Sequence, residues 1–162
     1  MWYTSAALLN DDERKVERMR RIVFLLILFA LALASCGGTP ADTTVPNPPN
    51  STAFEKSESA QVNQIVEGWK SQVPAEMKAQ QVKDPIEEKV YQSTASLQEI
   101  ADFYKKELTD KNWIHAQRMP GVQNGILVDG YDIGSTTLVI GAVDASQLGG
   151  SGVVVYTAKG TK

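Results

Sequence analysis

The residue best suited to covalent chemistry in this 162-residue chain is its only cysteine, Cys36. A deprotonated thiol is a strong nucleophile, but a lone cysteine forms neither an internal disulfide nor a cysteine-based zinc site. Cys36 closes the tetrapeptide Leu33-Ala34-Ser35-Cys36, which follows an unbroken apolar run over 22–33. Two small residues, Ala34 and Ser35, stand directly before the cysteine. The position of Cys36 at the end of an apolar run is therefore the first pattern to interpret.

Arg20-Arg21 and the apolar run over 22–33 have the order of a secretory signal, a positive region followed by a short apolar core. The run is too short for a spanning helix, which needs about 20 apolar residues. The tetrapeptide at its end closely resembles the lipobox of bacterial lipoprotein precursors. This resemblance implies a diacylglyceryl group on the Cys36 thiol, cleavage between Ser35 and Cys36, and membrane anchoring by the lipid. The alternative is an uncleaved anchor helix in which the cysteine is incidental.

The first eighteen residues fit a signal peptide poorly, because residues 11–13 place three acidic side chains in a region that should be basic. In the sequence as written, residues 1–35 are predicted to be the signal peptide that is removed. We predict that its true start is Met19. The residue directly after Cys36 is Gly37 and not an aspartate. In the lipoprotein sorting pattern this favours the outer membrane of a two-membrane bacterium, or the outer face of the membrane in a one-membrane bacterium.

The segment after the cysteine is predicted to be a disordered, lipid-anchored linker over 36–54. It is rich in Gly, Pro, Thr and Asn and offers almost nothing to bury. Its prolines favour local extension of the chain. Residues 45–49 can alternatively be interpreted as a proline-rich ligand motif.

Charge excludes one class of partner. From Cys36 onward the chain has net charge −4 and no cluster of basic residues along the sequence, whereas nucleic-acid binders usually carry a basic patch or stripe. We therefore expect no nucleic-acid partner. The partners predicted are the membrane, through the lipid on Cys36, and an envelope protein, glycan or lipid that the sequence does not identify.

The remaining polar residues form no recognisable catalytic, cofactor-binding or metal-binding motif, so we expect none of these sites and no cofactor. His115 is the only histidine and is predicted to be a solvated or partly packed strand residue. Glu87 and Glu88 are adjacent, so in a strand they would point to opposite faces. The glycine-rich stretch 149–152 lacks the spacing of a phosphate-binding loop. Three aspartates fail to match a calcium loop: Asp129, Asp132 and Asp144.

Two segments have the periodicity of amphipathic helices. The first spans 58–71, and Val73-Pro74 is expected to end it, because the residue before proline disfavours helical geometry. The second spans 97–109, where Ser96 and Glu99 form a capping box. A short strand over about 86–93 is expected between them.

Strand-like runs fill the rest of the chain, at 113–118, 126–131, 136–143 and 153–157. Short turns between them indicate an antiparallel meander, and continuous apolar runs indicate central strands with both faces covered. Gly141 inside a strand indicates a bulge or the close approach of a helix.

The predicted fold is a single α+β domain over 55–162, with an antiparallel sheet of about four to five strands. One long helix covers the sheet, and there is an additional N-terminal amphipathic helix. The segment from Leu97 to Trp113 weakly resembles a pattern in small uncharacterised bacterial lipoproteins, and this resemblance implies no functional residue. Four aromatic side chains are predicted to be core and could alternatively line a groove: Trp69, Phe103, Tyr104 and Trp113.

Two functions are compatible with these patterns. The first is a non-catalytic binding or scaffolding module in the cell envelope, which would show an exposed apolar patch near 149–152 or around Tyr131. The second is an envelope enzyme that uses aspartate or glutamate residues, which would need carboxylates converging in one pocket.

Overall fold

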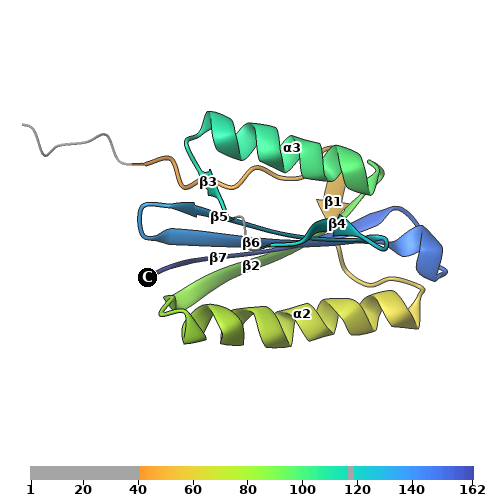
Figure 1. Ribbon diagram of the computed structural model, residues 1–162. Helices are drawn as coiled ribbons and strands as arrows, with labels where there is room; N and C mark the ends of the chain where they lie inside the picture. Colours follow the sequence, from red (N-terminus) through yellow and green to blue (C-terminus); the bar gives the residue numbers. More distant parts are fainter. Residues whose placement is uncertain (1–40, 117–118) are drawn as a thin grey trace, which may run out of the picture. The chain divides into compact units, whose positions relative to one another are not determined.

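Seven antiparallel strands form one sheet, and a long helix lies on each face of it (Figure 1). This is a computed structural model, and it describes residues 41–116 and 119–162. Residues Ala41–Lys162 make up one compact unit. The strand order is β1-β2-β7-β6-β5-β3, and β4 also pairs with β5.

The two helices are α2 (Ala60–Ala79) and α3 (Leu97–Asp110), and a short 3-10 helix, η2, spans Ala145–Leu148. The strands are β1 (Ser51–Ala53), β2 (Lys83–Ser93), β3 (Ile114–His115), β4 (Gly121–Gln123), β5 (Ile126–Ile133), β6 (Thr136–Asp144) and β7 (Val153–Thr161).

The α+β class, the antiparallel sheet and the two helices are confirmed, but the sheet has seven strands instead of about four to five, and the N-terminal helix also covers a face of it. The meander of β5, β6 and β7 is present as predicted. The strand predicted over 113–118 is reduced to Ile114–His115, and the edge of β5 is shared between β3 and β4. Residues 117–118 lie outside the described part of the chain.

Helix α3 begins where its sequence predicts. The Ser96 hydroxyl accepts a hydrogen bond from the Glu99 amide at 3.3 Å, and the Glu99 carboxylate accepts one from the Ser96 amide at 2.7 Å. These bonds satisfy amides that have no partner within the helix. They also hold the pKa of the Glu99 carboxyl below its ordinary value.

Helix α2 continues to Ala79, so the prediction that Val73-Pro74 would end it is wrong. Proline removes one helical hydrogen bond but does not prevent the next turn when tertiary packing compensates. Here the turn after Pro74 places Met77 in a buried cluster with Val82 and Tyr156. None of the helices within the described residues is long and apolar enough to cross a membrane.

The hydrophobic core lies on both faces of the central strands, as the apolar runs predicted. Beneath α3 the main buried side chains are Ile100, Tyr104, Leu108, Trp113, Leu138, Ile140 and Val155. Beneath α2 they are Val62, Val66, Met77, Val143, Val154, Tyr156 and Ala158. The absence of a side chain at Gly141 allows Trp69 of α2 to lie close to β6, because a Cβ atom there would be 3.1 Å from the Trp69 indole.

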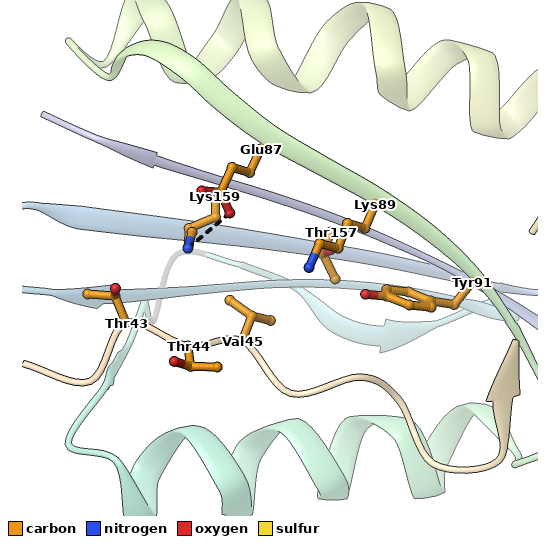
Figure 2. A pocket seen from close by; sticks show the side chains of 8 residues that line it. All are labelled: Thr43, Thr44, Val45, Glu87, Lys89, Tyr91, Thr157 and Lys159. Atoms are coloured by element: carbon orange, nitrogen blue, oxygen red, sulfur yellow. Dashed lines mark ion pairs between the residues drawn. The ribbon is translucent and has the colours of Figure 1, made fainter. Parts of the chain in front are cut away.

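Residues 41–54 are ordered, which corrects the predicted disordered linker over 36–54 and moves the start of the domain from residue 55 to Ala41. Helix α3 packs over β3 to β6 and leaves the β2–β7 side of the same face open. Val45 fills part of this gap, and Figure 2 shows it between the sheet and α3. Contacts with the sheet and with α3 thus bury part of a segment whose composition alone predicted disorder.

Polar bonds fix the same segment from end to end. The Lys111 ammonium contacts the Asp42 carboxylate at 3.0 Å and donates to the Thr44 carbonyl at 3.2 Å. The Ser93 hydroxyl donates to the Pro49 carbonyl, and β1 then pairs with β2. The part of the predicted linker before residue 41 lies outside the described residues.

Candidate functional site

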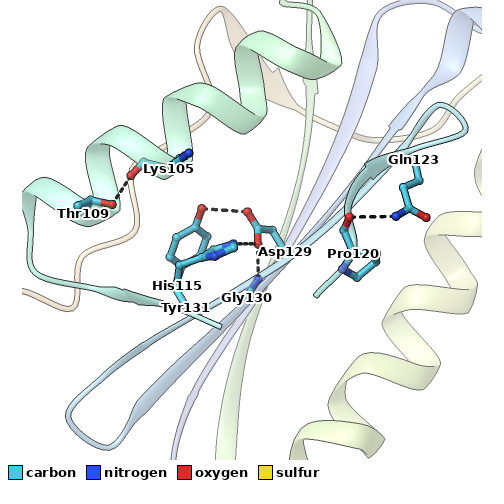
Figure 3. Close-up of polar contacts among 8 residues, drawn as sticks. All are labelled: Lys105, Thr109, His115, Pro120, Gln123, Asp129, Gly130 and Tyr131. Atoms are coloured by element: carbon cyan, nitrogen blue, oxygen red, sulfur yellow. Dashed lines mark hydrogen bonds and ion pairs between the residues drawn. The ribbon is translucent and has the colours of Figure 1, made fainter. Parts of the chain in front are cut away.

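A buried carboxylate on β5 collects three hydrogen-bond donors, as Figure 3 shows. The Asp129 residue is 7 % exposed, and its Oδ1 atom lies 2.5 Å from His115 Nε2 and 3.0 Å from the Gly130 amide. Its Oδ2 atom accepts the Tyr131 hydroxyl at 2.9 Å. Burial, followed by the bond to Asp129, raises the pKa of the Tyr131 phenol.

The sheet brings these residues together. Asp129 and Tyr131 are two positions apart on β5 and therefore share a face. His115 is the register partner of Tyr131 across the β3–β5 pair, and their rings lie 5.0 Å apart. The His115 side chain is 45 % exposed, so the prediction of a partly packed strand histidine is confirmed, but its pairing with Asp129 was not predicted.

This arrangement can hold an imidazole in one orientation, as an orienting carboxylate does for a general base. A nucleophilic catalyst would also need a hydroxyl or thiol within about 3 Å of the imidazole. Among the described residues, His115 has hydrogen-bond contact only with Asp129. The cluster as it stands fixes the edge strand β3 onto β5.

The other acidic residues do not join Asp129. Asp132 accepts the Thr137 hydroxyl, and Asp144 caps the short helix η2. Glu87 and Glu88 point to opposite faces, as predicted: Glu87 pairs with Lys159, and Glu88 accepts the hydroxyl of Tyr156. Within residues 41–116 and 119–162, no group of three or more His, Cys, Asp or Glu side chains could hold a metal ion.

The opposite face of β5 and β6 carries an apolar groove of about 270 Å³, bounded on one side by the second half of α2. Its apolar lining comes from Trp69, Val73, Met77, Met119, Val128 and Val139. Gly130 and Gly141 form part of the floor, where the absence of side chains lets Met119 and Trp69 lie close to the sheet. Three polar residues of α2 complete the lining: Gln72, Glu76 and Gln80.

The groove exists because α2 packs chiefly on β7, β2 and β6 and leaves much of this face of β5 uncovered. Ala116 lines the groove, and Ile114, two positions earlier on the same face, is 71 % exposed. An apolar surface thus extends from the groove to the sheet edge. Tyr131 is among the residues that line the groove, but it is almost fully buried and its hydroxyl bonds to Asp129 on the other face of β5.

The predicted aromatic core is confirmed for two of its members, since Tyr104 and Trp113 are almost fully buried and Phe103 packs partly against them. Trp69 has both roles, because it packs on Tyr156 at 6.1 Å between ring centroids and also lines the groove. The glycine stretch 149–152 follows η2 in a loop, and Gly149 caps that helix in a left-handed conformation.

The predicted lipidation and cleavage residues, Ser35 and Cys36, lie outside the described part of the chain. Comparisons of the chain with protein-family models, curated proteins and solved structures found no match.

Proposed function

We propose that this chain is a bacterial envelope lipoprotein, held on a membrane by lipid on Cys36, whose folded domain is a non-catalytic binding module. The observation that carries the binding role is the apolar groove between α2 and β5–β6. Binding sites are typically concave and mostly apolar, with a few polar groups that fix the orientation of the ligand, and the groove has this composition. The signal sequence and lipobox support the anchor and the envelope location.

The groove suits an apolar side chain of a partner polypeptide. At about 270 Å³ it lies just below the usual size of small-molecule pockets, so it would take part of a larger partner. Met77 and Met119 give the walls the adaptability common at protein-binding surfaces. Gln72 and Gln80 at the rim can both donate to and accept from peptide groups.

Site-specific photo-crosslinking in the native envelope tests this role. A photoreactive residue at Gln72, on the groove rim, should capture one reproducible protein, and Val128→Gln should abolish that adduct by making the groove floor polar. Lys105 on α3 provides the matched position on the opposite face. Adducts that are the same from Gln72 and Lys105, or unchanged by Val128→Gln, would refute the groove as the partner site.

Mass spectrometry of the mature N-terminus tests the anchor separately. A lipidated Cys36 is expected, and Cys36→Ser should leave the precursor unprocessed and without lipid. An unmodified N-terminus at Met1 or Met19 on the mature protein would contradict the anchoring proposal.

The second candidate is an envelope enzyme, which the buried Asp129 beside His115 favours. If the imidazole takes a proton from substrate, His115→Gln should abolish turnover while leaving folding and the Gln72 crosslink intact. Comparison of envelope peptidoglycan and lipid profiles between His115→Gln cells and wild-type cells tests this. Identical profiles would count against the enzyme.

A further inference from the structure

Lysines gather around a polar cleft where residues 43–45 lie beside β2 and β7 (Figure 2). Two adjoining cavities of about 160 and 500 Å³ share Thr43, Glu87 and Lys159 in their linings. Four lysines line the combined cleft: Lys83, Lys89, Lys159 and Lys162. The only acidic residues in that lining are Glu87 and Asp84. The cleft is therefore positive in a domain whose net charge is negative.

Two of these lysines are neighbours on one face of the sheet. Glu87 faces Lys159 across the β2–β7 pair, and Lys89 faces Thr157, so Lys89 and Lys159 are diagonal neighbours on one face. Figure 2 shows both amino groups directed toward the 43–45 segment. Like charges in this relation repel each other, and an anion between them would relieve the repulsion.

The carboxylates nearby neutralise only part of this charge. Glu87 pairs with Lys159 at 3.1 Å, Asp132 with Lys162 at 3.5 Å, and Asp84 with Lys78 at 3.0 Å. Within the described ranges of the chain, Lys83 and Lys89 contact no carboxylate at ion-pair distance. The hydroxyls of Thr43, Thr44 and Thr157 add hydrogen-bonding groups to the lining.

The cleft also lies beside the point where the chain leads back to the cysteine. Ala41 is the first described residue, and Thr43 and Thr44 line the cleft. Four residues lie between Cys36 and Ala41, and the five steps from one Cα atom to the next span at most roughly 18 Å. A lipid on Cys36 would therefore keep this end of the domain close to the bilayer.

We propose that the lysine cleft binds the phosphate groups of anionic lipids in the membrane that holds Cys36, so that the domain lies with this end on the bilayer. The proposal rests on the anchoring proposed above. Lysines near a bilayer surface gain from anionic headgroups, and salt screens the attraction. The cleft would set the orientation of the domain and leave the apolar groove accessible to its partner.

Vesicle binding by the mature chain 36–162 carrying Cys36→Ser tests the proposal without the contribution of the lipid. This form retains all three core clusters of the folded unit. The vesicles contain phosphatidylglycerol mixed with phosphatidylcholine, or phosphatidylcholine alone, at low salt. Lys83→Gln with Lys89→Gln is the test variant. Lys56→Gln with Lys105→Gln is the control, because it removes the same charge from exposed sites elsewhere.

The chain is expected to bind the phosphatidylglycerol vesicles and to be released from them in high salt. The affinity for these vesicles should fall roughly 25-fold in the test variant and change little in the control variant. Equal losses in both variants, or no preference for phosphatidylglycerol, would overturn the proposal. Saturable binding of inorganic phosphate without vesicle binding would also overturn it and indicate a site for a free anion. Lipidation at Cys36 and crosslinking at Gln72 are measured independently, so either can succeed where this test fails.

Discussion

The bond between Tyr131 and Asp129 gives a quantitative test of how the edge of the sheet is held. Both residues are buried, and the hydroxyl lies 2.9 Å from the carboxylate. A hydrogen bond to a charged group contributes about 1.5–3 kcal/mol. Tyr131→Phe should therefore lower the free energy of unfolding by about 2 kcal/mol. Asp129→Ala should lower the free energy of unfolding by about 3–5 kcal/mol. It removes the carboxylate to which three groups bond, and it leaves the buried Tyr131 hydroxyl without a partner.

The double variant separates this bond from simple loss of packing. Once Asp129 is alanine, changing Tyr131 to phenylalanine removes only the orphaned hydroxyl, so it should cost almost nothing. The coupling free energy should be about 2 kcal/mol, measured by urea unfolding with an unchanged slope. Tyr91→Phe is the control, because its hydroxyl bonds to exposed Asn47 and its loss should cost below about 1 kcal/mol. Additive effects of the two substitutions within about 0.5 kcal/mol would refute the reasoning.

Three further predictions follow from local geometry. Gly152→Ala should destabilise the fold by more than about 2 kcal/mol in urea unfolding, because its positive φ is strained for alanine and the new Cβ would meet the Ser93 carbonyl. Gly134→Ala, with positive φ but open space, should cost about 1 kcal/mol. Ser96→Ala should cost about 1 kcal/mol by the same measurement, through loss of the helix cap. Hydrogen bonds from Thr44, and then from Lys111, lower the pKa of the Asp42 carboxyl to about 2. NMR should therefore show the contacts of residues 42–44 intact above about pH 4 and weakening as the pH falls through about 2. An Asp42 carboxyl that titrates with an ordinary pKa would contradict this prediction.

Elements with strong local signals were predictable from the sequence. Helix α3 follows from Ser96 and Glu99, whose bonds form within four residues. The central strands follow from apolar runs that indicated cover on both faces, and of the two alternatives for Gly141, a bulge or a close helix approach, the structure shows the approach of Trp69. These features depend on neighbours in sequence, so no knowledge of distant contacts was needed.

Elements that depend on distant partners were not predictable. Helix α2 passes through Pro74 because Met77 finds a core beyond it, and residues 41–54 become ordered because α3 leaves part of one sheet face uncovered. The candidate sites share this dependence. Asp129 and Tyr131 can be placed on one face by strand alternation, but only the β3–β5 register brings His115 to them. The groove lies where α2 leaves β5 uncovered, and the lysine cleft lies where α3 leaves β2 and β7 uncovered.

The ordered residues 41–53 have a mechanical consequence. Asp42 and Thr44 are tied to Lys111 at the end of α3, while Pro49 and β1 are tied to β2. Tension on the chain ahead of Ala41 is therefore shared between α3 and β2, which are both distant in sequence from residues 41–53. A pull that reaches Ala41 would load α3 and β2 directly, before residues 41–53 could extend.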